Sequence, residues 1–173
     1  ERAFAALKNT GKVFVWGDNS YGGHNTAYVS NLSDISGIYS TERAFAALDT
    51  QGDVFVWGDI SYGGNSTDVQ GLSNVKKIYS TKGAFAALKE NGTVFVWGNN
   101  DYGGDNNTEV IDNSNNVKEI CSNDYAFAAL KNDGTVFVWG DDDYGGNNNE
   151  VIRTVQIKPH SLNNVNEICS TDR

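Results

Sequence analysis

Acidic side chains precede each Tyr-Gly pair of the sequence, and their oxygen atoms could bind calcium. The densest group is Asp141-Asp142-Asp143, with Glu150 close behind it. An Asp-x-Asp spacing near a glycine is typical of loops that surround Ca²⁺ with oxygen ligands. The full loop pattern fails, because its position 12, counted from Asp141, is Ile152 rather than Glu. Asp141, Asp143 and Glu150 are therefore weak calcium candidates, and a solvated turn is the preferred interpretation.

Residues for other kinds of chemistry are sparse. His24 and His160 stand in different loops, and the two cysteines, Cys121 and Cys169, form no Cys-x-x-Cys metal motif. The cysteines occupy equivalent points of neighbouring units, which are usually farther apart than the ~6 Å between Cα atoms that a disulfide tolerates, so we expect free thiols. No Ser/His/Asp or Cys/His arrangement recurs. The sequence predicts no catalytic residue, no cofactor and no enzyme activity.

Composition narrows the possible partners. The 173 residues are 39% hydrophobic and carry a net charge of −9, which argues against binding to nucleic acid or anionic lipid. No apolar run approaches the ~20 residues that span a bilayer, so we expect no membrane insertion. Because the chain has no Met and begins at Glu1, we expect a processed product, an excised piece or part of a longer protein.

The elements that must position these residues come from an internal repeat. Ala-Phe-Ala-Ala-Leu begins at residues 3, 44, 84 and 126, and Val-Phe-Val-Trp-Gly ends at residues 17, 58, 98 and 140. Tyr-Gly-Gly follows each time, and a segment such as Ile38-Tyr39-Ser40-Thr41 closes the unit. The sequence therefore predicts one domain, 1–173, of four repeats at about 3–43, 44–83, 84–125 and 126–173.

Each unit is expected to be a small antiparallel sheet. Val-Phe-Val-Trp has the β-branched and aromatic composition of a strand, and its alternation places Phe and Trp on one face and the two Val on the other. Polar residues and a Gly separate it from the alanine-rich run, which indicates a hairpin. The closing segment adds a third strand, and a weaker fourth is expected after Tyr-Gly-Gly. Three to four strands in about forty residues predict an all-β propeller blade; a parallel β-helix is the main rival.

Two sets of repeated residues are assigned structural roles. The four tryptophans could stack on a ligand, but their identical placement favours packing between blades: Trp16, Trp57, Trp97 and Trp139. The first glycines of the Tyr-Gly-Gly strings are interpreted as turn residues rather than phosphate-binding loops, because no Gly-Lys-Ser/Thr is present: Gly22, Gly63, Gly103 and Gly145.

The repeat resembles that of the regulator of chromosome condensation family. Gly92–Gly104 is similar to the family core Gly-x-Val-x-x-Trp-Gly-x-Asn-x-x-Gly, and related strings occur in the other three units. The resemblance implies propeller blades, mostly seven to a ring, in exchange factors for a small GTPase, chromatin-associated modules, parts of ubiquitin ligases and bacterial β-lactamase inhibitors. Tyr-Gly-Gly replaces the usual Gly-Gln-Leu-Gly ending and is closer to bacterial and environmental variants. No exchange-factor wedge motif is present, so that activity is not transferred.

Four blades of a seven-bladed circle cover about 206°, which would leave two apolar blade faces open, and no polar capping repeat is visible. The first hairpin lacks a preceding strand, and the last segment supplies a strand without a hairpin. The chain could close on itself as a four-bladed ring, continue into further repeats, or join other copies head to tail.

The fourth loop is the longest and most basic, so Arg153, Lys158 and His160 are candidate partner-binding residues; a tolerated insertion is the alternative. We expect a non-enzymatic protein-interaction scaffold that binds through the variable loops. The alternatives are a self-assembling structural subunit and an inhibitor or recognition module for another protein.

Overall fold

A computed structural model describes residues 2–105, 115–147 and 164–171 of the chain. It contains eleven strands: β1 (Ala3–Leu7), β2 (Val13–Gly17), β3 (Ile35–Ser40), β4 (Ala44–Asp49), β5 (Val54–Gly58), β6 (Val75–Ser80), β7 (Ala84–Lys89), β8 (Val94–Gly98), β9 (Val117–Ser122), β10 (Ala126–Lys131) and β11 (Val136–Gly140). Four short 3₁₀ turns follow the hairpins: η1 (Asn19–Tyr21), η2 (Ile60–Tyr62), η3 (Asn100–Tyr102) and η4 (Asp142–Tyr144). One α-helical turn, α1 (Ala27–Ser30), completes the described elements.

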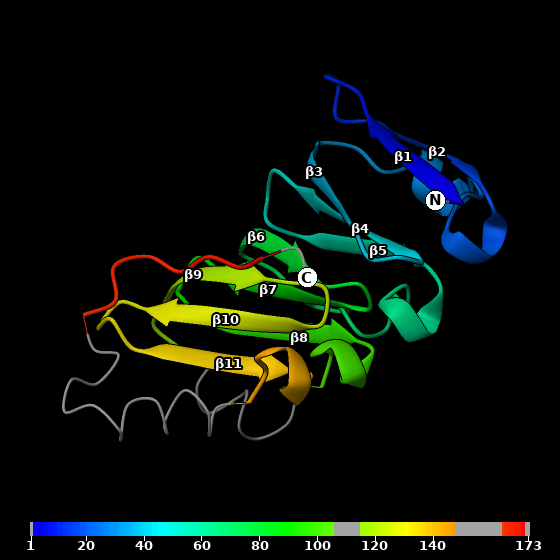
Figure 1. Cartoon of the computed structure of the whole chain (residues 1–173). Helices are drawn as coiled ribbons and strands as arrows, with labels where there is room; N and C mark the ends of the chain where they lie inside the picture. The colour runs from blue at the N-terminus through cyan, green and yellow to red at the C-terminus, as the bar shows by residue number, and fades with distance from the viewer. Residues whose placement is uncertain (1, 106–114, 148–163, 172–173) are drawn as a thin grey trace.

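The strands form four antiparallel sheets. Their orders are β1-β2, β3-β4-β5, β6-β7-β8 and β11-β10-β9. Figure 1 shows the sheets following one another along an open arc, with β1 and β2 at one end and β10 and β11 at the other. The all-β, propeller-type prediction is confirmed. The self-closed ring, one of the three arrangements that the sequence allowed, is not adopted.

Each hairpin forms because an alanine-rich strand and an aromatic strand pair in one fixed register. In the second sheet Phe45 lies opposite Trp57, and the two rings stack with their centroids 5.4 Å apart. Gly52 turns the chain between them with φ of +86°, a conformation that glycine adopts without steric cost. A cross-strand aromatic pair of this kind stabilises the hairpin by about 0.2–1 kcal/mol.

The sheets combine strands from two successive sequence units. β3 closes the first unit, yet it pairs with β4 of the second, with Ile38 opposite Ala47. β6 and β9 join the following hairpins in the same way. These three strands lie next to one another along the inner side of the arc (Figure 1). A blade in space is therefore offset from the sequence repeat by one strand.

The core lies between neighbouring sheets. Ala46 and Ala47 of the middle strand β4 are fully buried, on opposite faces of their sheet. Their small side chains let the adjacent sheets approach closely, and larger residues such as Phe85 fill the remaining space. Burial on both faces explains why the strands read as continuous apolar runs.

The segments after Tyr-Gly-Gly differ from the expected fourth strand in the first two units. Residues 27–30 form α1, and residues 65–74 follow a series of turns. Val29 and Leu32 of the first segment point into the core between sheets, where they join Val13 and Trp57. The segment therefore packs as a buried link rather than as an edge strand. No helix among the described residues is long and apolar enough to cross a membrane.

Candidate protein-interaction surface

A glycine of one sheet and an aromatic pair of the next form the joint between neighbouring sheets. Phe85 and Trp97 stack with ring centroids 5.1 Å apart and lie against Gly63 of the preceding sheet. The Trp97 Nε1 donates a hydrogen bond of 3.2 Å to the carbonyl oxygen of Gly63. A Cβ at Gly63 would lie 2.7 Å from a Phe85 ring carbon, and φ there is +95°. Both the backbone conformation and the close contact require glycine.

The joint recurs with one variation. Phe127 and Trp139 cover Gly103, and the Trp139 Nε1 donates to the Gly103 carbonyl oxygen at 3.2 Å. Gly22 is covered by the ring pair of β4 and β5, but the Trp57 Nε1 is buried without a partner among the described residues. A buried N–H that loses its hydrogen bond costs about 1–3 kcal/mol. The joint between the first two sheets is therefore the weaker one.

Each end of the arc exposes one part of this joint: an aromatic pair at one end and a glycine at the other. Phe4 and Trp16 stack like the other pairs but are 48% and 53% exposed, whereas Trp97 is 2% exposed. Trp16 thus departs from the expected packing between blades, because none of the described residues forms a sheet beyond β1 and β2. At the other end, a Cβ at Gly145 would have no described atom within 4 Å, although φ is +92° as at Gly63.

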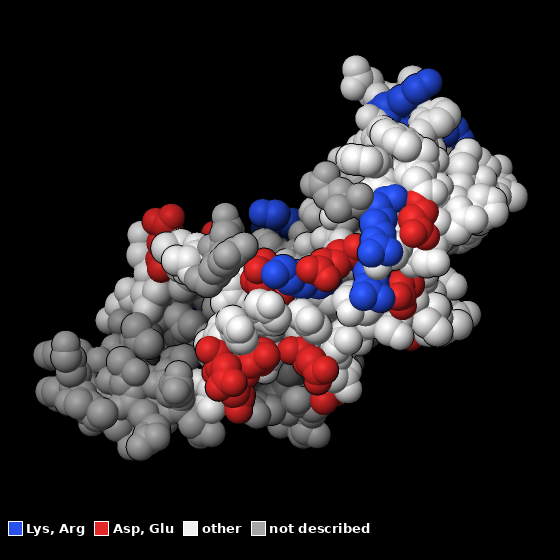
Figure 2. All heavy atoms as spheres, turned by 45° about the vertical axis from the view of Figure 1, so that its right-hand side comes forward, with Lys and Arg blue, Asp and Glu red and all other residues white. Residues whose placement is uncertain are grey.

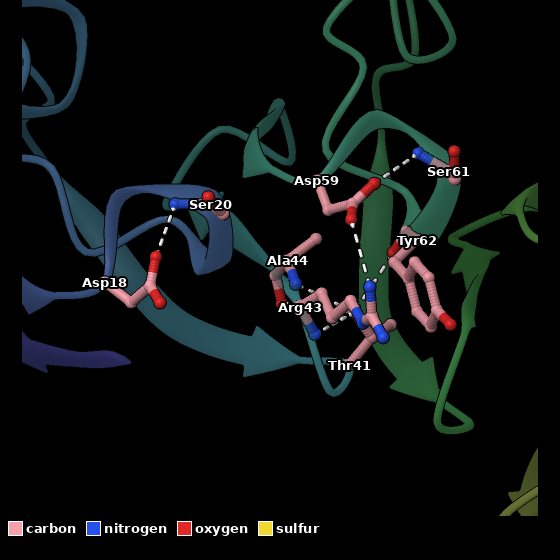
Figure 3. Close-up of polar contacts among 8 residues, drawn as sticks. All are labelled: Asp18, Ser20, Thr41, Arg43, Ala44, Asp59, Ser61 and Tyr62. Atoms are coloured by element: carbon pink, nitrogen blue, oxygen red, sulfur yellow. Dashed lines mark hydrogen bonds and ion pairs between the residues drawn. The ribbon is translucent and has the colours of Figure 1, made fainter. Parts of the chain in front are cut away.

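A ladder of aromatic and cationic side chains runs along one rim of the arc. The Arg43 guanidinium lies 5.4 Å from the ring centroid of Tyr21 and 4.6 Å from that of Tyr62. Arg43 also forms an ion pair with Asp59, with 3.7 Å between nitrogen and oxygen (Figure 3). Arg2 lies 4.9 Å from the Tyr21 ring centroid. Each cation–π contact of this exposed kind contributes about 0.5–1 kcal/mol.

The ladder changes chemistry toward the other end. Tyr125, at the position of Arg43, stacks between Tyr102 at 5.3 Å and Tyr144 at 4.1 Å. Gly83 takes that position in the third sheet, where a Cβ would lie 2.6 Å from the Tyr102 ring. Tyr62 and Tyr102 therefore approach each other directly, with centroids 6.4 Å apart.

The turns beside the ladder carry its acidic side chains. Each 3₁₀ turn begins at an Asp or Asn whose side-chain oxygen accepts a hydrogen bond from the backbone two residues later, as Asp59 does from the Ser61 N–H at 2.9 Å (Figure 3). Asp142 and Asp143 occupy the exposed positions of η4. Figure 2 shows Lys and Arg beside Asp and Glu across this side of the molecule, and other Asp and Glu side chains gathered apart from them.

Ion pairing links successive sheets at the same rim. The Lys82 Nζ lies 2.8 Å from an Asp124 carboxylate oxygen, and the Lys82 N–H donates to the Asp124 carbonyl oxygen at 2.8 Å. The Asp124 carboxylate accepts a hydrogen bond from the Lys82 ammonium and holds the pKa of that ammonium above its ordinary value.

The inner strands hold a second set of polar contacts. The Ser122 hydroxyl donates to the Ser80 carbonyl oxygen at 2.8 Å, and the Cys121 thiol donates to the Ile168 carbonyl oxygen at 3.1 Å. Burial raises the pKa of the Cys121 thiol, with the Glu119 carboxylate adding to the shift. Cys121 and Cys169 are both free thiols.

Two of the weak calcium candidates, Asp141 and Asp143, lie at the turn η4. The Asp141 carboxylate accepts a hydrogen bond from the Asp143 N–H at 2.9 Å and so caps η4. No three His, Cys, Asp or Glu side chains within 2–105, 115–147 and 164–171 could hold a metal ion as a group. Glu150 and the partner-binding candidates Arg153, Lys158 and His160 lie outside the described residues.

A cleft of about 610 Å³ opens between the first and second sheets. It is lined by Arg2, Phe4 and Ala5 on one side and by Ser40, Glu42 and Arg43 on the other. It thus borders the free edge of β1 and the first cation of the ladder.

Two features of the structure were not predicted from the sequence. The pairs Val29/Leu32 and Val69/Leu72 bury the links between sheets, and their shared Val-x-x-Leu spacing was a usable signal. The ladder was also missed, although Glu1-Arg2 repeats Glu42-Arg43 just before the alanine-rich strands. In the sequence, that repetition indicated only where each repeat begins.

Comparison with known proteins places these features in a family context. The profile of the regulator of chromosome condensation (RCC1) repeat matches residues 2–22, 75–103 and 117–145. No curated protein sequence matches the chain.

Several solved structures share the fold. Prp20p from Saccharomyces cerevisiae is 20% identical with a TM-score of 0.57, over 83% of this chain and 42% of its own. Human WBSCR16 is 23% identical with a TM-score of 0.54, over 81% and 46%. The ectodomain of the Arabidopsis thaliana receptor kinase ACR4 is 19% identical with a TM-score of 0.56, over 82% and 53%. The chain thus spans about half the length of these structures or less.

Proposed function

We propose, from the premise that this chain belongs to the RCC1 repeat family, that it is a non-enzymatic protein-interaction scaffold. Its binding surface is the rim at η3 and η4, and its partner is a protein with a segment rich in arginine or lysine. The glycine–aromatic joints hold the frame, and the exposed turn residues vary between units to provide the contacts.

The change of turn chemistry along the rim is the observation that carries this proposal. The two residues before the repeated Tyr are Asn19-Ser20 in η1 and Ile60-Ser61 in η2, but they are Asn100-Asp101 in η3 and Asp142-Asp143 in η4. The backbone is the same at all four positions. With the capping residue counted, η1, η2 and η3 each carry one aspartate and η4 carries three, so negative charge is concentrated at η4 by the side chains alone. Charge of one sign in one region attracts partners of the opposite sign.

The aromatic half of the same surface suits a guanidinium or ammonium group. Tyr144 is 46% exposed and stacks on Tyr125, so one ring is available beside the Asp142 and Asp143 carboxylates. The chain itself provides a precedent, because Arg43 stacks against two rim tyrosines while it pairs with an adjacent aspartate. A cation on a tyrosine face gains about 0.5–1 kcal/mol at an exposed site.

Neighbours of the same fold support a protein partner in general. Prp20p has binding properties toward Gsp1p and histones, and yeast RCC1 has been crystallised with Kap60 bound to it. Those partners belong to the neighbouring proteins, which are only about 20% identical to this chain. The proposal for this chain rests on its own rim.

The test uses a fluorescent arginine-rich peptide as the probe and follows its anisotropy as the chain is added. Asp142→Asn with Asp143→Asn removes two charges without changing side-chain shape. We expect binding to weaken by about two- to thirtyfold, because each of the two exposed charge pairs contributes about 0.2–1 kcal/mol. Added salt should weaken the wild-type complex and reduce the difference between the two proteins.

A matched variant separates local recognition from total charge. Asp53→Asn with Glu90→Gln also removes two exposed acidic charges, but from the hairpin turns at the opposite ends of the strands. It should bind the peptide nearly as well as the wild type. Equal weakening by both double variants, or no binding by the wild type, would refute the proposed site.

The basic fourth loop remains a separate prediction. Arg153, Lys158 and His160 suit an acidic partner rather than a basic one, so their replacement by Ala should leave binding of the arginine-rich peptide unchanged. Assembly of copies remains the second candidate function, and it is supported by β1, which pairs only with β2 among the described residues.

A further inference from the structure

Three lysines of two neighbouring inner strands, β6 and β9, surround one pocket between the third and fourth sheets. The pocket has a volume of about 380 Å³. Its lining residues are Lys76, Lys77, Lys118, Tyr79, Leu88 and Glu119. All three lysines are exposed. The whole chain has 13 Lys and Arg against 22 Asp and Glu, so a pocket with three ammonium groups and one carboxylate reverses the charge balance of the chain.

The register of each inner strand places one of these lysines outside the regular pairing. In β6 the pairing with β7 shifts between Val75 and Lys77, so Lys76 is an extra residue, as in a β-bulge. In β9 Lys118 is the extra residue in the same way. A bulge bends its strand and redirects the side chain of the extra residue. The two bulges therefore bring side chains of β6 and β9 to the same pocket.

The corresponding residues of the preceding inner strand have different chemistry. Ser36 is the extra residue of β3, and its hydroxyl donates a hydrogen bond to the Leu48 carbonyl oxygen at 3.0 Å. Gly37 follows it, where Lys77 stands in β6. The positive charge of the pocket thus comes from the side chains of β6 and β9 and not from the backbone that the repeats share.

Two of the lysines are held by contacts that leave their charge uncompensated. The Lys77 ammonium lies 4.7 Å from the ring centroid of Tyr79. The Lys118 Nζ donates a hydrogen bond to the Asn166 carbonyl oxygen at 3.2 Å. Neither they nor Lys76 form an ion pair with a carboxylate of the described residues. Because an ammonium group has three N–H donors, each lysine keeps donors that can bind an anion.

The other lining residues form an apolar wall and carry one opposing charge. Leu88 is buried, and Tyr79 packs against the core cluster that contains Ile120 of β9. An apolar wall keeps water from one side of a bound anion, which strengthens its attraction to the ammonium groups. The Glu119 carboxylate repels an anion in the same pocket, so its charge reduces the affinity without cancelling that of three lysines.

We propose that this lysine pocket binds a ligand that carries a phosphate group. A phosphate monoester has a charge of about −1.5 to −2 at neutral pH and three acceptor oxygens, so it can accept hydrogen bonds from several ammonium groups at once. A single carboxylate has one charge and two oxygens. Three lysines around one pocket suit one phosphate or diphosphate group rather than the long row of phosphates in a nucleic acid. This site is separate from the acidic rim.

Binding is tested by isothermal titration calorimetry with inorganic pyrophosphate at low ionic strength. The wild-type chain should bind it, and Lys76→Met with Lys118→Met should raise the dissociation constant by about two- to thirtyfold, because each exposed charge contact changes affinity by about 1.4- to fivefold. The matched control is Lys8→Met with Lys12→Met, which removes two exposed ammonium groups from the hairpin between β1 and β2. Equal weakening by both double variants, or no binding by the wild type, would refute the site.

The carboxylate of the pocket gives an effect of opposite sign. Glu119→Gln removes a charge that repels the anion and should lower the dissociation constant for pyrophosphate by up to about fivefold. Glu42→Gln removes an exposed carboxylate at the start of the second hairpin, away from the pocket, and should have little effect. An unchanged or raised dissociation constant for Glu119→Gln would show that the anion does not occupy this pocket.

Two further ligands test the chemical class and the source of the phosphate. Succinate carries two carboxylates and should bind more weakly than pyrophosphate; equal binding of succinate would overturn the phosphate assignment. Nα-acetyl-phosphoserine amide presents the phosphate as a modified protein does. Tighter binding of this compound than of inorganic phosphate would identify a phosphorylated partner protein as the source, and tighter binding of inorganic phosphate or pyrophosphate would identify a free phosphate.

Discussion

The indole nitrogen of Trp97 donates a hydrogen bond to the carbonyl oxygen of Gly63, 3.2 Å away in the preceding sheet. This bond and the ring contact on the same glycine fix the distance between two sheets that share no backbone ladder. Equivalent positions of other repeats lack one of these contacts. Comparing the repeats therefore separates the stability that comes from the glycine backbone conformation, from the ring contact and from the hydrogen bond.

Gly63→Ala should destabilise the chain more than Gly145→Ala. Both glycines have φ near +90°, so both variants share a backbone cost of about 1–3 kcal/mol. Only the alanine at position 63 would also clash with Phe85, which adds about 1–3 kcal/mol. Urea unfolding of the two variants at low protein concentration measures the difference. Equal loss of unfolding free energy would mean that the glycine is required for its backbone alone.

Trp97→Phe should lower the free energy of unfolding by about 1 kcal/mol more than Trp57→Phe. The two substitutions remove similar ring area, but only Trp97 donates a hydrogen bond through Nε1, and such a bond contributes about 0.5–1.5 kcal/mol. Chemical denaturation followed by circular dichroism avoids the change in tryptophan fluorescence. A larger loss for Trp57→Phe would contradict the assigned hydrogen bonds.

Arg43→Gln should loosen the joint between the first and second sheets. The substitution removes a guanidinium that contacts two tyrosine rings and one carboxylate, so we expect a loss of about 1 kcal/mol. Amide hydrogen exchange should accelerate in β1 and β2 and remain unchanged in β9 to β11. Arg2→Gln removes contact with a single ring and should have the smaller effect.

The hairpin between β10 and β11 should show a pH-dependent contribution that its neighbour lacks. The Asp133 carboxylate accepts hydrogen bonds from the Thr135 hydroxyl at 2.7 Å and the Thr135 N–H at 2.9 Å, and these bonds lower the pKa of Asp133. A carboxyl whose pKa is lower in the folded state stabilises that state above its unfolded pKa. The contribution is lost as the pH falls through the folded pKa.

Thr135→Val should therefore lower the melting temperature at neutral pH more than at acidic pH. The control is Thr93→Val, because Thr93 makes the same two bonds to the uncharged side chain of Asn91. Its effect should not depend on pH over the range in which Asp titrates. Parallel pH profiles for the two variants would show that the charge of Asp133 contributes nothing at this turn.

Local features of the fold could be predicted from the sequence because they depend on neighbours in the chain. The strand pairs, the hairpin at Gly52 and the alternation of Val13 and Phe14 follow from composition and period. The difference between Trp16 and Trp97 could not be predicted in this way, because both stand in the same Val-Phe-Val-Trp-Gly string. Their exposure depends on whether another sheet precedes them.

At the rim, too, local turns could be predicted from the sequence, whereas contacts between distant residues could not. The turn at Asp141-Asp142-Asp143 was recognisable from the sequence, and in the structure the Asp143 N–H donates a hydrogen bond to the Asp141 carboxylate. The ladder needed three dimensions, since Tyr21 and Arg43 are 22 positions apart in the sequence. Gly83 had no visible role until the structure placed it beside Tyr102.

The repeated joint has a consequence for how such a chain changes over generations. Gly22, Gly63 and Gly103 each lie against the ring pair of the following sheet, although only the Gly63 and Gly103 carbonyl oxygens accept an indole hydrogen bond. The ring contact itself therefore does not require one particular neighbour. After an in-frame duplication or deletion of one unit in the gene, each remaining joint would still have a glycine facing an aromatic pair. Variation in length is therefore accessible to this architecture in single genetic events, apart from rim positions such as Gly83, where a Cβ would lie 2.6 Å from the Tyr102 ring.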